Sequence, residues 1–457
     1  MKKVISLALA CVLVFSSLCL PAFSATGRSK DYTIVSPYAD VDWSTWNLYK
    51  TNFHTHTTAS DANVDLNEMV MEYYKQGFDV LCITDHGVTG KAWNEQPTQL
   101  PLYLYQYIIG NKVTPLTDEE YEGVTSGTYP VDGQPRGYGM TCVTGGNELN
   151  ALTITKCHVN GIYLPPHAGD NYLGYENDHE GAVKLADEAG AYSFINHPGD
   201  WLHSNRDRSV VSDPENVHYF SDIILKYDSC RGMEIFNEKN SVTPYDRVLW
   251  DNVLMECLPY GKNVIAYSNS DAHSLDMVDS SFEIFVMPEN TEENVKEAVL
   301  NGVFFCTTRN LPADEDIGPE EGFNVRNQGL DYPEFTEVSV DGHTVTVKVR
   351  NCNTLNWVAN GKVIAGSAVD ESAEEAEFTL DLDTIEGAEN FLYVRAQIYG
   401  KGGCTVTQAL VLDDGSEPLK YEPDTSSSAK VDHFFYRLFS TRFAVLVQLI
   451  IDRIKNG

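Results

Sequence analysis

Histidine and carboxylate side chains follow several apolar runs in this chain, and these are residue types that hold divalent metal ions. His54 and His56 lie two residues apart in NFHTHTTASD. In an extended strand both side chains point to the same face, so together they can bind one ion. Asp85 and His86 follow the short apolar run DVLCI. The spacing therefore predicts two strand ends that carry metal ligands.

The same pattern recurs further along the chain. TCVT leads through two glycines to Glu148, with His158 ten residues later, AYSFI is followed by His197, and VIAYS by Asp271 and His273. A single histidine of this kind is most often structural, but an ensemble after apolar β-type runs is hard to obtain from core packing. The predicted metal ligands are His54, His56, Asp61, His86, Glu148, His158, His197, Asp271 and His273.

Five short motifs occur in a fixed order: HTHTTASD, TDHG, GNE followed by a histidine, NHP and SDAH. In this order they resemble the motifs of the PHP (polymerase and histidinol phosphatase) metal-dependent phosphoesterases, over roughly residues 49–309. The resemblance implies an α/β fold, a distorted barrel of seven βα units. It also implies two or three divalent ions, Zn²⁺, Mn²⁺ or Fe²⁺, at the C-terminal ends of the strands.

The resemblance also implies a role for each matching residue. His54, His56, Glu148 and Asp271 would hold one ion; Glu148 would bridge to a second held by His158 and His197; Asp61, His86 and His273 would hold a third. The catalytic residues would be Glu148, Asp271 and His273, supported from behind by Asp85 and Glu234. The chain departs from the pattern at Asp61, where some relatives have histidine, and in a long insertion over residues 91–140.

Two arginines after the NHP motif are candidate substrate contacts. Arg206 and Arg208 lie in the segment that follows this motif, and arginine binds phosphate oxygens with two parallel hydrogen bonds. The alternative is that they pair with the neighbouring Asp207 and Asp213.

Composition changes divide the chain into segments. Residues 1–24 have two lysines, an apolar run and a small-residue cleavage site, which predicts a signal peptide and hence export to the cell envelope or exterior. A hydrolase domain is predicted over 25–320 and a small all-β sandwich over 325–415, where short alternating strands follow one another. A linker over 416–430 precedes an amphipathic helix over 431–457, predicted to contact a membrane surface or a partner protein.

The formal net charge of −34 disfavours extended nucleic acid as a partner, because such a surface repels polyanions. We therefore expect an exported phosphoesterase that hydrolyses phosphate mono- or diesters of small molecules by a metal-bound hydroxide. Nucleotides or nucleic-acid ends, cleaved by 5′–3′ exonuclease-like activity, fit this chemistry. One alternative is a metal-dependent hydrolase of carbamates, amides or esters. Another is a non-catalytic envelope binding protein.

Overall fold

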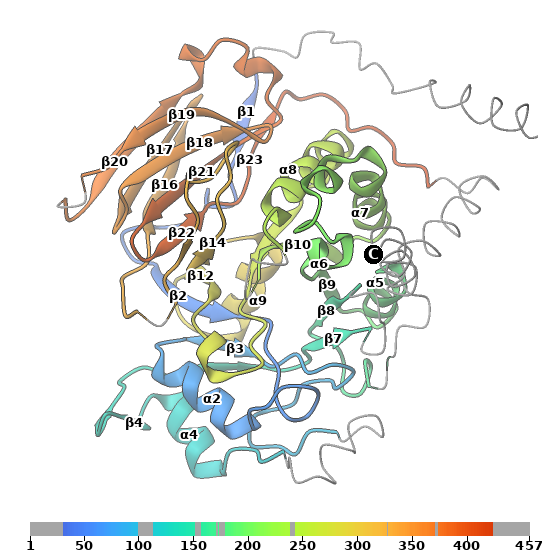
Figure 1. Ribbon diagram of the computed structural model, residues 1–457, viewed down its shortest axis with the longest axis vertical. Coiled ribbons are helices and arrows are strands. Elements are labelled where there is room, and N and C mark those ends of the chain that lie inside the picture. Colours follow the sequence, from blue (N-terminus) through green and yellow to red (C-terminus); the bar gives the residue numbers. More distant parts are fainter. Residues whose placement is uncertain are drawn as a thin grey trace, which may run out of the picture.

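The computed structural model describes residues 31–98, 113–150, 157–170, 172, 179–237, 243–326, 328–370 and 373–423. The predicted signal peptide and the predicted C-terminal helix lie outside these residues, as do parts of the linker and of the long insertion. The described chain is a mixed α/β protein in which sheets predominate over helices (Figure 1). Across these ranges, no helix combines the length and apolar character needed to cross a bilayer.

The first ligand-bearing strands are parallel neighbours in one sheet. They are β2 (Asn47–Asn52), β3 (Val80–Cys82) and β6 (Thr141–Val143). Asn52 pairs with Leu81 and Cys82 with Val143, so the three strands end almost level. On the other side of β2 the sheet continues with the antiparallel strands β12 (Ser281–Met287) and β13 (Phe304–Thr308).

A second sheet holds the remaining ligand-bearing strands. Its order is β11 (Ile265–Ser268), β10 (Cys230–Phe236), β9 (Tyr192–Ile195), β8 (Val159–Ile162) and β7 (Asn147–Leu149). Strands β9, β10 and β11 are parallel, whereas β8 is antiparallel to both β7 and β9. This sheet is covered by α5 (Glu180–Glu188), which packs on β8 and β9, and by α7 (Pro214–Lys226) and α8 (Asp246–Cys257), which pack on β10 (Figure 1).

The two sheets are joined where their ligand-bearing strands end. Thr55, just after β2, forms an isolated parallel bridge with Ala272, just after β11. The backbone N–H of Glu148 donates to the carbonyl oxygen of Thr84 at 3.0 Å. Strand ends from both sheets therefore meet in one place, which is where α/β folds gather their functional side chains.

The strands after residue 330 form two layers (Figure 1). One layer contains the hairpin of β16 (Glu334–Asp341) and β17 (Thr344–Arg350), which forms a sheet with β20 (Ala376–Asp381). The other layer comprises β18 (Thr354–Ala359), β19 (Lys362–Ala368), β21 (Tyr393–Gly400), β22 (Gly403–Val406) and β23 (Leu410–Asp413). Val347 from the first layer and Trp357 and Ile398 from the second share one hydrophobic cluster.

The second layer is continuous with the first sheet of the metal-ligand region. Strand β22 pairs with β13, with Cys306 opposite Val406, and β1 (Thr33–Val35) pairs with β23. The sheet thus runs across the domain boundary predicted near residue 325, and the division into domains remains a prediction.

Local sequence signals account for the first helix. Helix α2 (Leu66–Lys75) begins after Asp65, whose side chain accepts a hydrogen bond from the N–H of Leu66. Beyond its C-terminal end lies Gly77, with a φ of 82°. The remaining elements are α4 (Asp118–Ser126), α6 (Pro198–Leu202), α9 (Glu292–Asn301), β4 (Pro130–Val131), β5 (Gln134–Pro135), β14 (Asn310–Leu311), β15 (Phe323–Asn324) and short 3₁₀ helices at Arg208–Ser212, Leu258–Tyr260, Leu275–Met277, Leu382–Thr384 and Ala388–Asn390.

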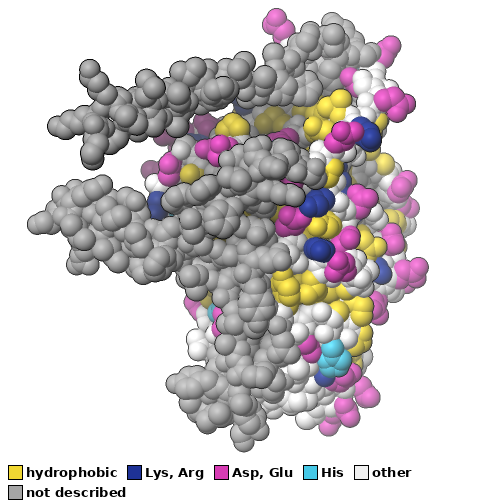
Figure 2. Space-filling model, turned by 90° about the vertical axis from the view of Figure 1, so that its right-hand side faces the viewer, with side chains coloured by type: hydrophobic (Ala, Val, Ile, Leu, Met, Phe, Trp, Pro, Cys, Tyr) yellow, Lys and Arg dark blue, Asp and Glu magenta, His cyan; other side chains and the backbone are white. Residues whose placement is uncertain are grey.

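The surface reflects the acidic composition. On the face drawn in Figure 2, Asp and Glu side chains are spread over the described part and outnumber Lys and Arg. The formal net charge of the whole chain is −34. Such a surface repels extended polyanions at long range, while a buried cation site can still capture a single phosphate group.

Candidate metal centre

The structure brings the nine predicted ligands into one cluster. Seven are buried: His54, His56, His86, Glu148, His158, His197 and Asp271. The other two lie at its open side, where the side chain of Asp61 is 44% exposed and that of His273 is 32% exposed. Side chains distant along the sequence therefore converge at one place, and Asp61 and His273 form its rim.

Glu148 stands at the centre of the cluster, with its two carboxylate oxygens facing different histidines. Oε2 lies 3.2, 3.0 and 3.3 Å from the Nε2 atoms of His54, His56 and His86, and Oε1 lies 3.0 Å from Nδ1 of His158 and 3.1 Å from Nε2 of His197. Two ligand atoms bound to one ion at about 2.0–2.2 Å are about 3.0–3.5 Å apart. The spacing around Glu148 fits such shared coordination.

The most buried group of possible ligands comprises His54, His56, Glu148 and Asp271, whose candidate ligand atoms all lie within 4.8 Å of one another. Oδ1 of Asp271 is 3.3 Å from Nε2 of His54 and 3.1 Å from Nε2 of His56. These three atoms are buried and make no hydrogen bond of good geometry. Buried polar atoms that face one another in this way are costly unless a cation lies among them, so the residues fit a divalent metal ion.

Two further groups share members with the first. One is His56, Asp61 and His86, and the other is His86, Glu148 and His158. His86 contacts both Glu148, at 3.3 Å, and Asp61, at 3.7 Å, so it lies between the second and third ligand sets implied by the sequence. His273 approaches Asp61 with 3.3 Å between Nε2 and Oδ1. The three groups therefore share ligands and form one continuous cluster.

Two of the ligands have a strained backbone. His197 has a φ of 28° and Asp271 a φ of 45°, in the left-handed region that side-chain-bearing residues seldom adopt. Strain of this kind costs about 1–3 kcal/mol and tends to occur at functional sites. His197 lies two residues after β9 and Asp271 three residues after β11, so the strained backbone lies in the turns that bring these side chains into the cluster.

Asp85 holds the loop that carries the first ligands. Its carboxylate accepts hydrogen bonds from the N–H and Oγ1 of Thr57, both at 2.7 Å, and from Oγ of Ser60 at 2.7 Å. Ser60 Oγ is in turn 3.4 Å from Nδ1 of His56. Asp85 thus contacts residues that neighbour His56, and its supporting role stays a prediction.

Glu234 contacts two of the ligand residues. Its carboxylate accepts from Nδ1 of His54 at 2.9 Å and from the backbone N–H of His197 at 2.9 Å. A carboxylate behind a histidine fixes its tautomer and orientation and raises its basicity. The predicted supporting position of Glu234 agrees with this geometry.

Two asparagine side chains also belong to the cluster, and the sequence analysis did not predict them. Asn196 donates from Nδ2 to Oε1 of Glu148 at 2.8 Å, and Asn269 donates to Glu234 at 3.3 Å. Both lie inside motifs that were recognised for their neighbours, NHP and NSDAH. An amide one or two residues from a predicted ligand was the available signal.

The charges of the cluster shift its pKa values in opposite directions. Burial acts to lower the pKa of His56, but Asp271 and Glu148 outweigh burial and raise it to about 10, and the pKa of His197 is raised to about 9 mainly by Glu148 against the same burial. His158 shows the reverse balance, because burial lowers its pKa to about 4. Without a metal ion, protons on His56 and His197 compensate the buried carboxylates.

These shifts predict a pH dependence for the protein stripped of metal by a chelator. A histidine whose pKa is higher in the folded than in the unfolded protein stabilises the fold. This stabilisation is fully present below the unfolded-state pKa of about 6.5, and it is lost as the pH rises through the folded-state pKa. We expect the unfolding temperature of stripped protein to fall between pH 7 and 10 more than that of metal-loaded protein, because bound cations replace these protons. Thermal unfolding of both forms across this range tests the expectation, which identical pH profiles would contradict.

The two candidate substrate arginines are placed differently. Nη2 of Arg208 lies 3.2 Å from Oδ1 of Asp314, and Arg208 also pairs with Asp316, while its guanidinium lies 5.2 Å from the ring centre of Tyr245. Its partners are thus neither Asp207 nor Asp213. Arg206 is exposed. A substrate contact by either arginine remains a prediction.

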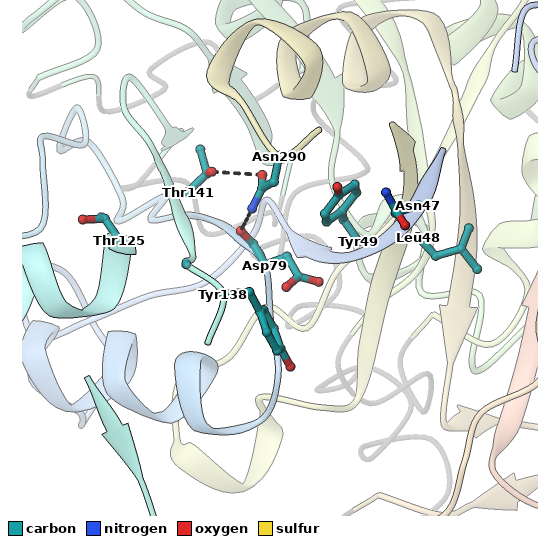
Figure 3. Close-up of a pocket in the computed structure, with 9 residues that line it drawn as sticks. Asn47, Leu48, Tyr49, Asp79, Thr125, Tyr138, Thr141 and Asn290 are labelled. Atoms are coloured by element: carbon teal, nitrogen blue, oxygen red, sulfur yellow. Dashed lines mark hydrogen bonds between the residues drawn. The ribbon is translucent and has the colours of Figure 1, made fainter. Parts of the chain in front are cut away.

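A cavity of about 490 Å³ lies away from the cluster (Figure 3). It opens near the N-terminal ends of β2, β3 and β6, whereas the cluster follows the C-terminal ends of the same strands. Figure 3 shows the carboxylate of Asp79 near Tyr49 and Tyr138. The two oxygens of Asp79 accept from Arg136 and from the backbone N–H of Lys50, both at 2.9 Å. The lining includes no histidine, so this cavity is not the metal site.

No family model matches the chain, and no curated protein matches it. Among solved structures, the chain is similar to a two-domain protein from Bacteroides vulgatus containing a predicted PHP-like metal-dependent phosphoesterase, with 18% identity, 84% of this chain and 100% of that chain covered, and a TM-score of 0.39. It is also similar to the lesion-specific endonuclease EndoQ from Pyrococcus furiosus, with 14% identity, 56% of each chain covered and a TM-score of 0.31.

An amidohydrolase from Chromobacterium violaceum is similar over 49% of this chain and 87% of that chain, with 14% identity and a TM-score of 0.27. The named neighbours thus include a PHP-like metal-dependent phosphoesterase and an endonuclease. Because all three TM-scores are below 0.5, the case for a function rests on the cluster itself.

Proposed function

We propose that this chain is a metal-dependent hydrolase of the PHP type that cleaves phosphate mono- or diesters. The observation that supports this most strongly is the position of Glu148, whose two oxygens face five histidine nitrogens at 3.0–3.3 Å. A bridging carboxylate with histidines on both sides suits two neighbouring divalent ions. Zn²⁺, Mn²⁺ and Fe²⁺ all accept this donor set.

Divalent ions bound here would act as Lewis acids and supply an activated water at neutral pH. The protein's own contribution is positional. Glu148 and Asp271 bring negative charge between the histidines, Glu234 fixes the ring of His54, and Asp85 fixes the loop of His56. Because Asp61 and His273 form the exposed rim, a phosphate group reaches the cluster past these two side chains.

The proposal extends to the barrel and to the substrate. We infer that strands of the two sheets together make the distorted seven-unit barrel implied by the motifs, an inference supported by the bridge between Thr55 and Ala272. The acidic surface favours small phosphorylated substrates, including nucleotides and nucleic-acid ends, over extended duplexes. Export remains a proposal that rests on the sequence pattern of residues 1–24 alone.

Metal content is expected to depend on the first two histidines. His54→Ala combined with His56→Ala removes two ligand atoms from the most buried group, so purified variant protein should carry at least one metal ion fewer than the wild type. Elemental analysis measures the metal content of both proteins, after circular dichroism has shown that each is folded. A matched control is His167→Ala combined with His218→Ala, since both of these histidine side chains are exposed. Equal metal content in all three proteins would defeat the ligand assignment.

Three substrates assayed in parallel separate the proposed function from its rivals. Metal-loaded protein is expected to hydrolyse nitrophenyl phosphate or a dinucleotide and to lose this activity in the His54→Ala, His56→Ala variant. Activity confined to nitrophenyl acetate would favour the carbamate, amide or ester hydrolase instead. Metal binding with no turnover of any of the three would favour a binding protein.

A further inference from the structure

His197 differs from four of the other ligand histidines in how its second ring nitrogen is held. The Nδ1 atoms of His54, His56, His86 and His273 each lie within 2.9–3.4 Å of a carboxylate, hydroxyl or carbonyl oxygen. Nδ1 of His197 is buried and has no hydrogen-bond partner among the described residues. A metal-bound histidine nearly always donates its second N–H to an oxygen. His197 therefore needs an acceptor that the direct contacts do not supply.

An unused carboxylate lies close to the same turn. Asp246, the first residue of α8, is 1% exposed, and neither of its oxygens makes a hydrogen bond of good geometry in the described chain. It packs against Gly199, two residues after His197: a Cβ atom added to Gly199 would lie only 2.1 Å from Oδ1 of Asp246. A residue with a side chain at position 199 would therefore clash with the carboxylate of Asp246.

A third polar atom belongs to the same place. The same added Cβ atom would lie 2.6 Å from Oγ of Ser204, which is also buried and without a hydrogen-bond partner in the described part. Oδ1 of Asp246 and Oγ of Ser204 are therefore both within 2.6 Å of one point beside Gly199. Buried water molecules typically make about three hydrogen bonds to polar groups of this kind.

The electrostatics agree with this arrangement. Burial raises the pKa of Asp246 well above its usual value, and the backbone N–H of Gly199 and then the charge of His197 act in the opposite direction. A buried carboxyl group of this kind is costly unless hydrogen-bond donors reach it. A donor at Nδ1 of His197 meets the needs of both side chains.

We propose that Asp246 is a positioning residue for His197. Nδ1–H of His197 donates a hydrogen bond to one water molecule, which in turn donates to the carboxylate of Asp246 and also binds Ser204. This contact directs Nε2 of His197 toward the ion shared with Glu148. This inference rests on the proposed metal-dependent function. It assigns to α8 a part in holding the metal centre, although α8 contributes no ligand.

The test compares metal retention in the wild type, Asp246→Asn and Asp79→Asn. Each protein is loaded with Zn²⁺, dialysed against graded concentrations of a chelator and analysed for bound metal. Loss of the acceptor carboxylate of Asp246 is expected to lower the affinity for one ion about 10- to 100-fold. Asp79 is the matched control, because it is also a buried carboxylate but lies at the other end of the strands. The unfolding temperature of each variant is measured in the same buffers.

The outcomes separate the inference from the proposed function. Support requires that Asp246→Asn lose one ion at lower chelator concentration while Asp79→Asn retains metal like the wild type at a similar unfolding temperature. Retention by Asp246→Asn equal to the wild type overturns the inference and leaves the metal centre intact. Equal weakening in both variants also overturns it, because the effect is then one of general stability. A wild type that binds no Zn²⁺ overturns the proposed function itself.

Discussion

Glu148→Gln is expected to lower kcat/KM for a phosphoester substrate on the order of 10³-fold or more and to remove metal from the purified protein. The substitution preserves size and shape, but it replaces one of two ligand oxygens with an amide nitrogen that cannot bind a cation. Because the two oxygens face different histidines, the change breaks the link between ligand sets. Steady-state kinetics and elemental analysis on the same preparation measure both effects.

The control for this substitution is Glu337→Gln, which makes the same chemical change on the surface. Glu337 pairs with Lys348 at 2.6 Å in the β16–β17 hairpin, so its replacement should leave activity and metal content within error of the wild type. If Glu148→Gln kept full metal content and activity, the bridging role would have to be abandoned.

Asp251→Ala is expected to destabilise the fold by about 3–5 kcal/mol. Asp251 of α8 and Arg395 of β21 form a fully buried ion pair, with Nη2 to Oδ2 at 2.7 Å and Nε to Oδ1 at 2.9 Å. Tyr393 also donates to Oδ1 of Asp251, at 2.5 Å. Removing the carboxylate leaves the guanidinium buried without its counter-charge, and this is the main cost. Urea unfolding monitored by tryptophan fluorescence gives the change in the free energy of unfolding.

A double variant distinguishes the ion pair from simple loss of packing. Asp251→Leu combined with Arg395→Met removes both charges and fills much of the space, so it should be clearly more stable than Asp251→Ala. If the double variant were as unstable as the single one, unpaired charge would not be the cause. Metal content should stay at the wild-type value in both, because neither residue contacts the cluster.

The sequence predicted the metal-ligand residues best where a ligand follows a recognisable strand. His86, His197 and Asp271 each follow a short apolar run, a pattern consistent with a buried strand. The ends of parallel neighbours meet at one edge, so the convergence of their side chains could be predicted. The cap at Asp65 and the hairpin at Asp341 and Gly342 were likewise local signals.

What the sequence could not supply was pairing between distant segments. The antiparallel placement of β8 between β7 and β9, and the joining of β13 to β22, depend on backbone hydrogen bonds that any residue type can make. The sequence suggested that Arg208 pairs with acidic residues close to it in the chain. Its partners are instead Asp314 and Asp316, more than a hundred positions away. Asp246 likewise belongs to no motif, and only the fold places its carboxylate beside Gly199.

The pairing of β13 with β22 affects how the protein can be shortened. A truncated form ending near residue 320 would keep every proposed ligand, yet it would leave the N–H and C=O groups along one side of β13 open to solvent. Exposed strand edges recruit strands from other molecules, so such a fragment would be prone to self-association. The C-terminal layer therefore also serves as a permanent cover for the sheet that carries the first metal ligands.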